Sequence, residues 1–284
     1  MKILACIVAF NPGKYEKYIA RNIETLSSIS DVSILIVEND GNEKVINNLK
    51  KSFKNVSGIS YQSSLKVRLP GEAFNDALHE AERANYDYVY FLDQDSLIST
   101  DTISLLKNET LDFSFLASSV ISEEDDTYLP YFRGNLNDSM TFHSAKQSNG
   151  SRNKINAAGY TGLLINMSIV RNNNIYINNH LKIELDDYDF TYRLSRIKPG
   201  ILVPESKVTH PNKKPDRNNF CGEVLDAYLQ LFEINRTGRA KMHVENYLYL
   251  IDKYGKGTHT RLKKELHKCM WINTMLLALK RFEN

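Results

Sequence analysis

Apolar and polar residues alternate in a regular rhythm over the first hundred positions of the chain. Apolar runs predict strands at Ile3–Phe10, Val32–Val37 and Tyr86–Leu92, and a short strand is expected at Gly58–Gln62, the third of the four along the chain. Between them, apolar residues at helical spacing predict helices at Tyr15–Ser28 and Gly71–Asn85, and a polar helix is expected at Glu43–Phe53. Strands that alternate with helices predict βαβ units, and therefore a mainly parallel sheet with right-handed crossovers.

The rhythm changes after Asp95. A short helix is expected at Thr102–Leu106, and further strands are expected at Phe113–Val120, Tyr128–Phe132, Ala157–Asn166 and Ile201–Val203, the last followed by a turn at Pro204. The polar segment Gly134–Lys154 predicts a loop, and the pattern beyond Pro215 is helical. The expected fold is therefore an α/β domain over residues 1–215, a sheet flanked by helices, with a helical region over residues 216–284.

Two carboxylates close the apolar run Tyr86–Leu92, in the order Asp93-Gln94-Asp95. Ligands of open α/β sheets bind at the carboxyl ends of the strands, and side chains two residues apart on a strand point the same way. Asp93 and Asp95 can therefore share a divalent cation, Mg²⁺ or Mn²⁺, which in turn suits a diphosphate. A solvated turn explains the same residues equally well. The metal interpretation gains from the segment Ala9-Phe10-Asn11-Pro12-Gly13, which matches no glycine-rich phosphate loop.

A second acidic cluster contains Asp186, Asp187 and Asp189, followed by Arg193. In a helix Asp189 and Arg193 are four residues apart and can form an ion pair. Asp187, or alternatively Asp186, is a candidate general base that deprotonates an acceptor hydroxyl. An acidic helix start followed by an ion pair is the structural alternative.

Two further side chains are open to two interpretations each. His210 is a candidate ligand for Mn²⁺ or a surface residue. Arg68 is a candidate partner of a phosphate or a base edge, or a solvated arginine. Asn75 lies on the other side of the Pro70-Gly71 turn from Arg68.

The order of these motifs resembles the family-2 glycosyltransferases of the GT-A fold. The resemblance rests on the Asn-Pro after the first strand, Glu38-Asn39, Phe91-Leu92-Asp93-Gln94-Asp95, Gly159-Tyr160-Thr161-Gly162, and Asp186 to Phe190 with Arg193. Bacterial rhamnosyltransferase-like enzymes are the subgroup of greatest similarity, and the acidic cluster also resembles galactofuranosyltransferases. The resemblance extends over about residues 1–215.

The resemblance implies a set of roles for individual residues. The nucleotide-sugar would contact Ala9, Phe10, Asn11, Glu38, Arg68, Asn75, Asp93, Gln94 and Asp95, although Glu38 stands where the family more often has aspartate. The acceptor would contact Gly159, Tyr160, Thr161 and Gly162. Mn²⁺ or Mg²⁺ would be held by Asp93, Asp95 and His210. Asp187 or Asp186 would be the catalytic base, and Arg193 would support this segment.

The implied activity is metal-dependent transfer of a sugar from a nucleotide donor to a saccharide acceptor, with inversion, in bacterial surface polysaccharide assembly. Rhamnose from dTDP-rhamnose is the leading donor, and galactofuranose or a hexose from a UDP-sugar is the alternative. A non-catalytic nucleotide- or saccharide-binding module stays open. A nucleotidyltransferase is disfavoured, since its phosphate loop is missing and the acidic cluster would have no purpose.

Composition adds expectations about location and partners. The 284 residues carry a net charge of +2, which indicates no nucleic-acid partner. Three scattered cysteines form neither a disulfide framework nor a zinc motif, which favours the cytoplasm. No run approaches the ~18 apolar residues that span a bilayer. The basic, amphipathic segment Thr258–Asn284, with Trp271, predicts a contact with the inner face of the plasma membrane, a contact with a second subunit, or packing on its own domain.

Overall fold

The computed structural model describes residues 1–10, 12–39, 41, 43–64, 66–138, 140–146, 151–181, 185–211 and 239–255. Asn11 and the segment Thr258–Asn284, for which nucleotide and membrane contacts are expected, lie outside these residues. One compact unit comprises Met1–Asn135, Phe142–His180 and Asp186–Asn212. The described helix α8 (Arg239–Tyr254) belongs to a second unit. None of the described helices combines the length and apolarity that crossing a bilayer requires.

The first half of the central sheet is parallel. It consists of β1 (Ile3–Ala9), β2 (Val32–Glu38), β3 (Ile59–Gln62) and β4 (Tyr88–Asp93), in the order β3-β2-β1-β4. All four strands therefore end at the same edge. This half matches the strands expected from the apolar runs to within two residues at each end.

The second half adds strands of both directions. Next to β4 lies β11 (Leu163–Asn166), which runs antiparallel both to β4 and to β6 (Phe115–Ser122). The long strand β12 (Gly200–His210) pairs in parallel with β6, while β5 (Leu97–Ile98) and β9 (Asn153–Ile155) pair with β12 in the antiparallel sense. The longest pairings are parallel, so the expectation of a mainly parallel sheet is confirmed.

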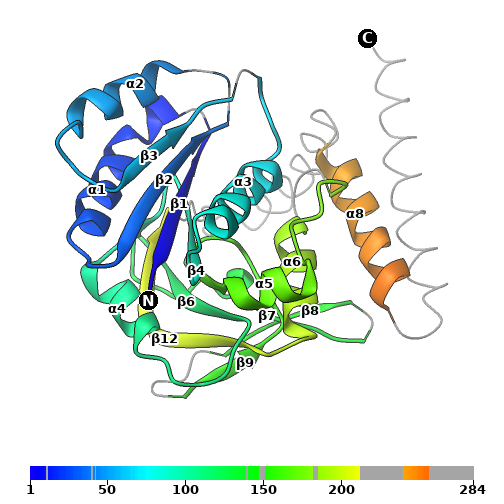
Figure 1. The fold of residues 1–284 in the computed structure, drawn as a ribbon. Coiled ribbons are helices and arrows are strands. Elements are labelled where there is room, and N and C mark those ends of the chain that lie inside the picture. The colour runs from blue at the N-terminus through cyan, green and yellow to red at the C-terminus, as the bar shows by residue number, and fades with distance from the viewer. Residues whose placement is uncertain are drawn as a thin grey trace, which may run out of the picture. The chain divides into compact units, whose positions relative to one another are not determined.

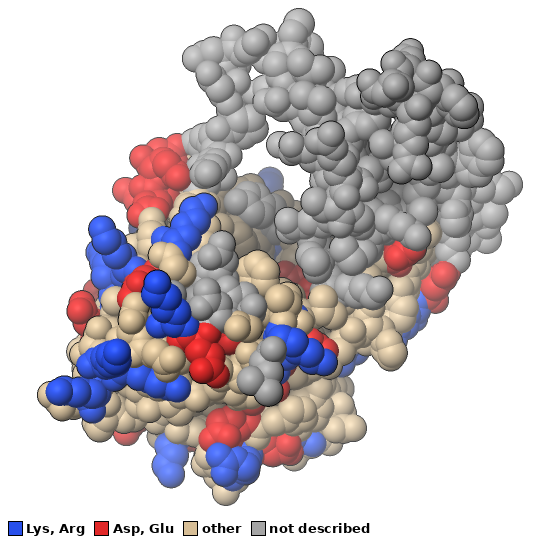
Figure 2. Space-filling view, turned by 90° about the horizontal axis from the view of Figure 1, so that it is seen from above, with Lys and Arg blue, Asp and Glu red and all other residues tan. Residues whose placement is uncertain are grey.

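Two layers of helices cover the sheet (Figure 1). The core of one face contains α1 (Glu16–Ser27), α2 (Glu43–Ser52) and α4 (Thr100–Lys107). The core of the other contains α3 (Pro70–Arg83), α5 (Met167–Asn173) and α6 (Asp186–Ser195). The alternation of β1 explains both layers, because Ile3, Ala5 and Ile7 join the first core and Leu4 and Cys6 join the second. Figure 2 shows basic and acidic side chains interspersed over the described part of one face, in keeping with the small net charge.

The segment after β6 corrects two expectations. In place of a strand at Tyr128–Phe132 there is an isolated bridge at Tyr128 and a 3-10 helix, η2 (Pro130–Phe132). In place of a loop over Gly134–Lys154, β7 (Arg133–Leu136) and β8 (Phe142–Ser144) form a three-stranded sheet with β10 (Ala157–Ala158), and β9 follows. These strands are short and have exposed polar residues, so no apolar run marks them.

Two other strand expectations were wrong in their bounds. The strand expected at Ala157–Asn166 is divided into β10 and β11 by a turn at Gly159–Gly162. Pro204 does not end the strand that begins at Gly200, because β12 continues to His210 through a register shift between Val203 and Lys207. A proline, which lacks an N–H donor, is tolerated at such an irregularity.

A close approach between β6 and β12 yields a stability prediction. Gly200 pairs with Phe115, and a Cβ atom at Gly200 would overlap the Phe115 ring. Gly200→Ala should lower the free energy of unfolding by about 1–3 kcal/mol, the usual cost of overpacking. Denaturant unfolding measures this loss. The double variant Gly200→Ala/Phe115→Leu should lose less than the sum of the two single losses, and strictly additive losses would contradict the packing explanation.

Candidate functional site

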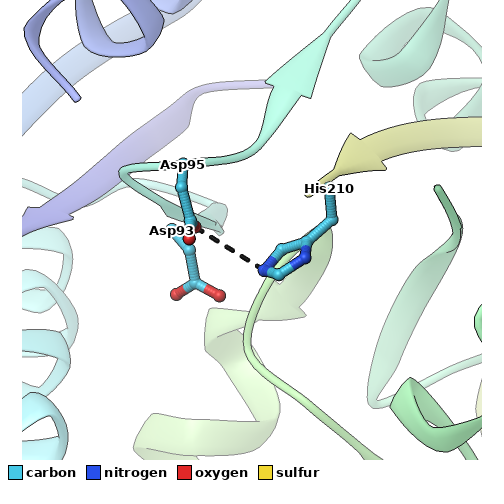
Figure 3. Close-up of side chains that lie close together, drawn as sticks. All are labelled: Asp93, Asp95 and His210. Atoms are coloured by element: carbon cyan, nitrogen blue, oxygen red, sulfur yellow. Dashed lines mark ion pairs between the residues drawn. The ribbon is translucent and has the colours of Figure 1, made fainter. Parts of the chain in front are cut away.

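Two strand ends bring the predicted metal ligands together (Figure 3). Asp93 is the last residue of β4, Asp95 lies in the turn that follows, and His210 is the last residue of β12. Ligand atoms of these three side chains all lie within 4.8 Å of one another. The Nε2 atom of His210 is 3.6 Å from Oδ1 of Asp95. The predicted trio therefore forms one cluster at the carboxyl edge of the sheet.

The chemistry of this cluster fits a divalent cation. The Nδ1 atom of His210 lies 2.7 Å from the carbonyl oxygen of Pro211, which can only accept, so Nδ1 donates and Nε2 is the ring nitrogen that faces Asp95 and could bind a cation. Burial, and then the charge of Asp95, raise the pKa of Asp93 to about 6, partly offset by His210. A bound cation would relieve the repulsion between the carboxylates. Two carboxylates and an imidazole suit Mn²⁺ better than Mg²⁺.

The middle residue of the motif binds protein rather than facing the cluster. The main-chain N–H of Phe10 donates to Oε1 of Gln94 at 2.9 Å, and Nε2 of Gln94 donates back to the Phe10 carbonyl. Asn39, the residue that follows β2, donates its N–H to the carbonyl of Ala9 at 2.8 Å. Gln94 thus connects Phe10, the residue after β1, to the turn that contains Asp95. Ala9 is buried and the Phe10 side chain is 49% exposed at this edge.

The end of β2 holds polar atoms that lack protein partners. Glu38 is fully buried and accepts a hydrogen bond from the Ser64 N–H. Asn39 and Arg68 are joined by two hydrogen bonds, and Arg68 also pairs with Asp76 at 2.6 Å. Within the described residues, Oδ1 of Asn39 and Nε and Nη2 of Arg68 are buried without a hydrogen-bond partner. Buried donors and acceptors without a partner indicate a place where a polar group of a ligand is expected.

Asn75 has a different set of contacts. Its side chain donates to the Ile177 carbonyl and to Asn179, and accepts from the Ile177 N–H at 2.8 Å. These contacts fix the segment that precedes α6. The predicted nucleotide contact of Asn75 stays a prediction.

The acidic cluster begins α6, and its three carboxylates have different partners. Tyr160 donates its hydroxyl to Asp186 at 3.0 Å, and Arg193 pairs with the fully buried Asp189 at 2.7 Å while also donating to the Tyr176 carbonyl. Asp187 is partly exposed and accepts the main-chain N–H of Tyr188 at 2.8 Å. Asp186 and Asp189 are engaged by side-chain donors, so Asp187 is the better placed candidate base.

Neighbouring groups and burial change the acidity of this cluster. Burial, followed by the charges of Asp186 and Asp93, raises the pKa of Asp187 well above its usual range. Burial raises the pKa of Asp186 to about 6, and the hydrogen bond from Tyr160 lowers it in part. A raised pKa gives the Asp187 carboxylate more affinity for a proton, which a general base requires.

The Gly159–Gly162 turn lies between the two acidic groups. The Oγ1 atom of Thr161 accepts the Asp93 N–H at 3.0 Å. A Cβ atom at Gly159 would lie 3.4 Å from Oδ2 of Asp187 and 3.0 Å from the Phe132 ring, so the absence of a side chain keeps the approach to Asp187 open. Gly162 has φ +73°, a conformation that favours glycine. This turn connects the metal cluster to the candidate base.

Sequence reasoning missed several residues at this edge. The ring centres of Phe132 and His210 are 5.1 Å apart, Tyr18 donates to Glu123, and the Glu123 N–H donates to the His210 carbonyl at 3.0 Å. Arg133 is buried beside the Gly159–Gly162 turn. No motif contains these residues, and their partners are distant in sequence.

Comparisons with known proteins identify the fold. No family model and no curated protein matches the chain. Among solved structures, S. aureus TarS 1-349 in complex with UDP-GlcNAc is 15% identical with a TM-score of 0.55, covering 76% of this chain and 60% of that one. GalNAc-T7 with UDP, GalNAc and Mn²⁺ is 15% identical with a TM-score of 0.58, covering 75% and 44%. The mannosyltransferase PcManGT from Pyrobaculum calidifontis, in complex with GDP-Man and Mn²⁺, is 14% identical with a TM-score of 0.54, covering 88% and 70%.

These likenesses show that the chain has the GT-A-type fold of these glycosyltransferases. The chain spans 60% of the length of the TarS fragment.

The metal cluster gives a direct binding prediction. Asp95→Asn and His210→Gln should each weaken Mn²⁺ binding about tenfold or more, because each removes a ligand from the cluster. Electron paramagnetic resonance of free Mn²⁺ during titration of the protein measures this change. Asp112→Asn, at an exposed ion pair near the start of β6, should bind Mn²⁺ as the wild type does. Wild-type affinity in Asp95→Asn would exclude this cluster as the Mn²⁺ site.

Proposed function

We propose that this protein is an inverting, metal-dependent glycosyltransferase that moves a sugar from a nucleotide-diphosphate donor to a saccharide acceptor. The observation that carries the proposal is the arrangement at one sheet edge, where the turn containing Gly159 and Thr161 connects the Asp93, Asp95 and His210 cluster to Asp187. A general base opposite a diphosphate site is what direct displacement at a sugar needs.

The residues of the chain have separate parts in this reaction. Asp187 takes the proton of the acceptor hydroxyl as its oxygen bonds to the anomeric carbon, and the bond from that carbon to the diphosphate breaks, with inversion. Asp93, Asp95 and His210 would hold the cation, and a bound cation would neutralise the charge of the departing diphosphate. Tyr160 and Arg193 fix Asp186 and Asp189, and so orient the start of α6. No enzyme nucleophile takes part.

The proposed donor is dTDP-rhamnose, with a UDP-linked galactofuranose or hexose as the alternative. The imide edge of thymine or uracil has two carbonyl acceptors and one N–H donor. Near the end of β2, Arg68 has two donor atoms and Asn39 has one acceptor atom without a hydrogen-bond partner among the described residues. These atoms could pair with the two acceptors and the one donor of that edge. The structural neighbours bear UDP, UDP-GlcNAc or GDP-Man. Manganese is present in two of them.

The proposed setting is bacterial surface polysaccharide assembly, with a lipid-linked saccharide as the acceptor at the inner face of the plasma membrane. The basic segment Thr258–Asn284, which lies outside the described residues, is the proposed membrane contact.

A donor panel tests the activity and the base together. Nucleotide release from dTDP-rhamnose and several UDP-sugars should occur with Mn²⁺ and stop with EDTA. Asp187→Asn should lower the rate about 100- to 10,000-fold, the usual contribution of a general base, with nucleotide affinity retained. Asp186→Asn, which removes the negative charge but keeps an oxygen that can accept from Tyr160, should have the smaller effect.

Three other outcomes would each contradict a different part of the proposed function. Release that is equal in Asp187→Asn and wild type would remove Asp187 as the base. Donor binding without release from any donor, with or without a saccharide acceptor, would favour the non-catalytic binding module. If no donor binds with any metal, the metal–diphosphate interpretation of Asp93 and Asp95 fails.

The raised pKa of Asp187 also predicts a pH-dependent stability difference. Because the folded-state pKa lies above the unfolded value, the folded protein holds this proton more tightly, and stability is lost as pH rises through the raised pKa. Asp187→Asn, measured by unfolding without metal, should therefore be more stable than wild type near pH 7. This gain should vanish near pH 4, where the carboxyl is neutral. An Asp187→Asn variant that is less stable at both pH values would contradict the buried-charge explanation.

A further inference from the structure

Arg133 is fully buried, and among the described residues its guanidinium donates to main-chain carbonyls. Nε donates to Ser118 at 2.8 Å, one terminal nitrogen donates to Phe132 and to Gly159 at 2.8 and 3.0 Å, and the other donates to Thr161. No carboxylate within the described residues lies at ion-pair distance from it. The carbonyl oxygens are therefore its direct partners.

An arginine in this position is costly for stability. Burial lowers the pKa of Arg133 to about 10, so the side chain is still a cation at neutral pH. A buried cation whose direct partners are carbonyl oxygens is costly to desolvate, and an apolar side chain of similar length would avoid that cost. An apolar side chain, however, cannot donate hydrogen bonds to carbonyl groups of β6, η2 and the Gly159–Gly162 turn at the same time, as this guanidinium does.

The turn that Arg133 holds is the segment that touches both acidic groups of the site. Thr161 gives its carbonyl to Arg133 and its Oγ1 to the Asp93 N–H. Gly159 gives its carbonyl to Arg133 and lies beside Asp187. At Gly162 a Cβ atom would lie 3.3 Å from the guanidinium, so the turn is closely fitted to this side chain. A shift of the turn would alter the spacing between Asp93 and Asp187.

We propose that Arg133 is a positioning residue, which fixes the Gly159–Gly162 turn and thereby sets the separation of the metal-binding carboxylates from the base Asp187. The proposal rests on the proposed function for its catalytic consequence. Its structural content, the hold on the turn, is independent of that function.

The test compares Arg133→Lys with the matched control Arg171→Lys. Arg171 also donates to main-chain carbonyls, those of Ala81 and Tyr86, but at the opposite edge of the sheet. Lysine keeps the charge and loses the forked geometry in both variants. Arg133→Lys should lower kcat about 10- to 100-fold, as expected for misplaced catalytic groups, while the Kd for the nucleotide with Mn²⁺ changes less than about threefold. Arg171→Lys should leave kcat unchanged.

Amide hydrogen exchange provides the readout that needs no activity. The N–H groups of Gly159, Gly162 and Asp93 donate to Phe132, Phe91 and Thr161, and they should exchange about tenfold faster in Arg133→Lys than in Arg171→Lys. Thr161→Val removes the Oγ1 that accepts the Asp93 N–H, and combined with Arg133→Lys it should reduce kcat by less than the product of the single effects.

The outcomes separate this proposal from the proposed function. A wild-type protein that transfers no sugar refutes the proposed function, and the exchange rates then decide whether Arg133 holds the turn. If Arg133→Lys folds and matches Arg171→Lys in kcat and in exchange at these amides, the positioning role is refuted. A parallel loss of kcat, nucleotide affinity and melting temperature in Arg133→Lys also refutes it, since that pattern indicates general destabilisation.

Discussion

The arrangement of this site depends on one strand that runs against its neighbours. β4, β6 and β12 all end at the same edge, and β11 lies antiparallel between β4 and β6, so β11 must begin where they end. The register aligns Leu163 with Phe91, and Gly162 donates its N–H to the Phe91 carbonyl. The turn before β11 is therefore forced to lie beside Asp93. The candidate metal ligands reach this edge through the ends of β4 and β12, and that turn lies between them and Asp187 of α6.

The charges gathered at this edge oppose folding. Asp93, Asp186 and Asp187 all have raised pKa values, for which burial is the largest cause, and Arg133 is a buried cation. Ionised groups in such places cost stability unless a ligand or a hydrogen bond compensates them. The two apolar cores on the faces of the sheet carry the fold and tolerate this cost. Side chains that lower stability where they are placed are typical of functional sites.

The fold was predictable where hydrophobic periodicity is strong and the contacts are local. The first four strands and the helices between them follow from apolar runs and helical spacing, and the Asp93 and Asp95 pair was evident because it closes such a run. The strands β7 and β8 were missed because half-exposed, polar strands have no such run. Arg133 and Glu123 were missed for another reason. Arg133 binds the Gly159 carbonyl and Glu123 binds the His210 carbonyl, and only the tertiary fold brings each residue to a partner so distant in sequence.

Two hydrogen bonds join the Gln94 side chain to the main chain of Phe10, and so connect the end of β1 to the turn that contains Asp95. A ligand that restricted one segment would therefore also restrict the other, and would lower the entropy cost of a second binding event. Coupling of this kind is reciprocal, so a cation at Asp95 would strengthen binding beside Phe10 by the same factor as the reverse. The glutamine between the two aspartates would thus make cation and nucleotide bind cooperatively, although it need touch neither.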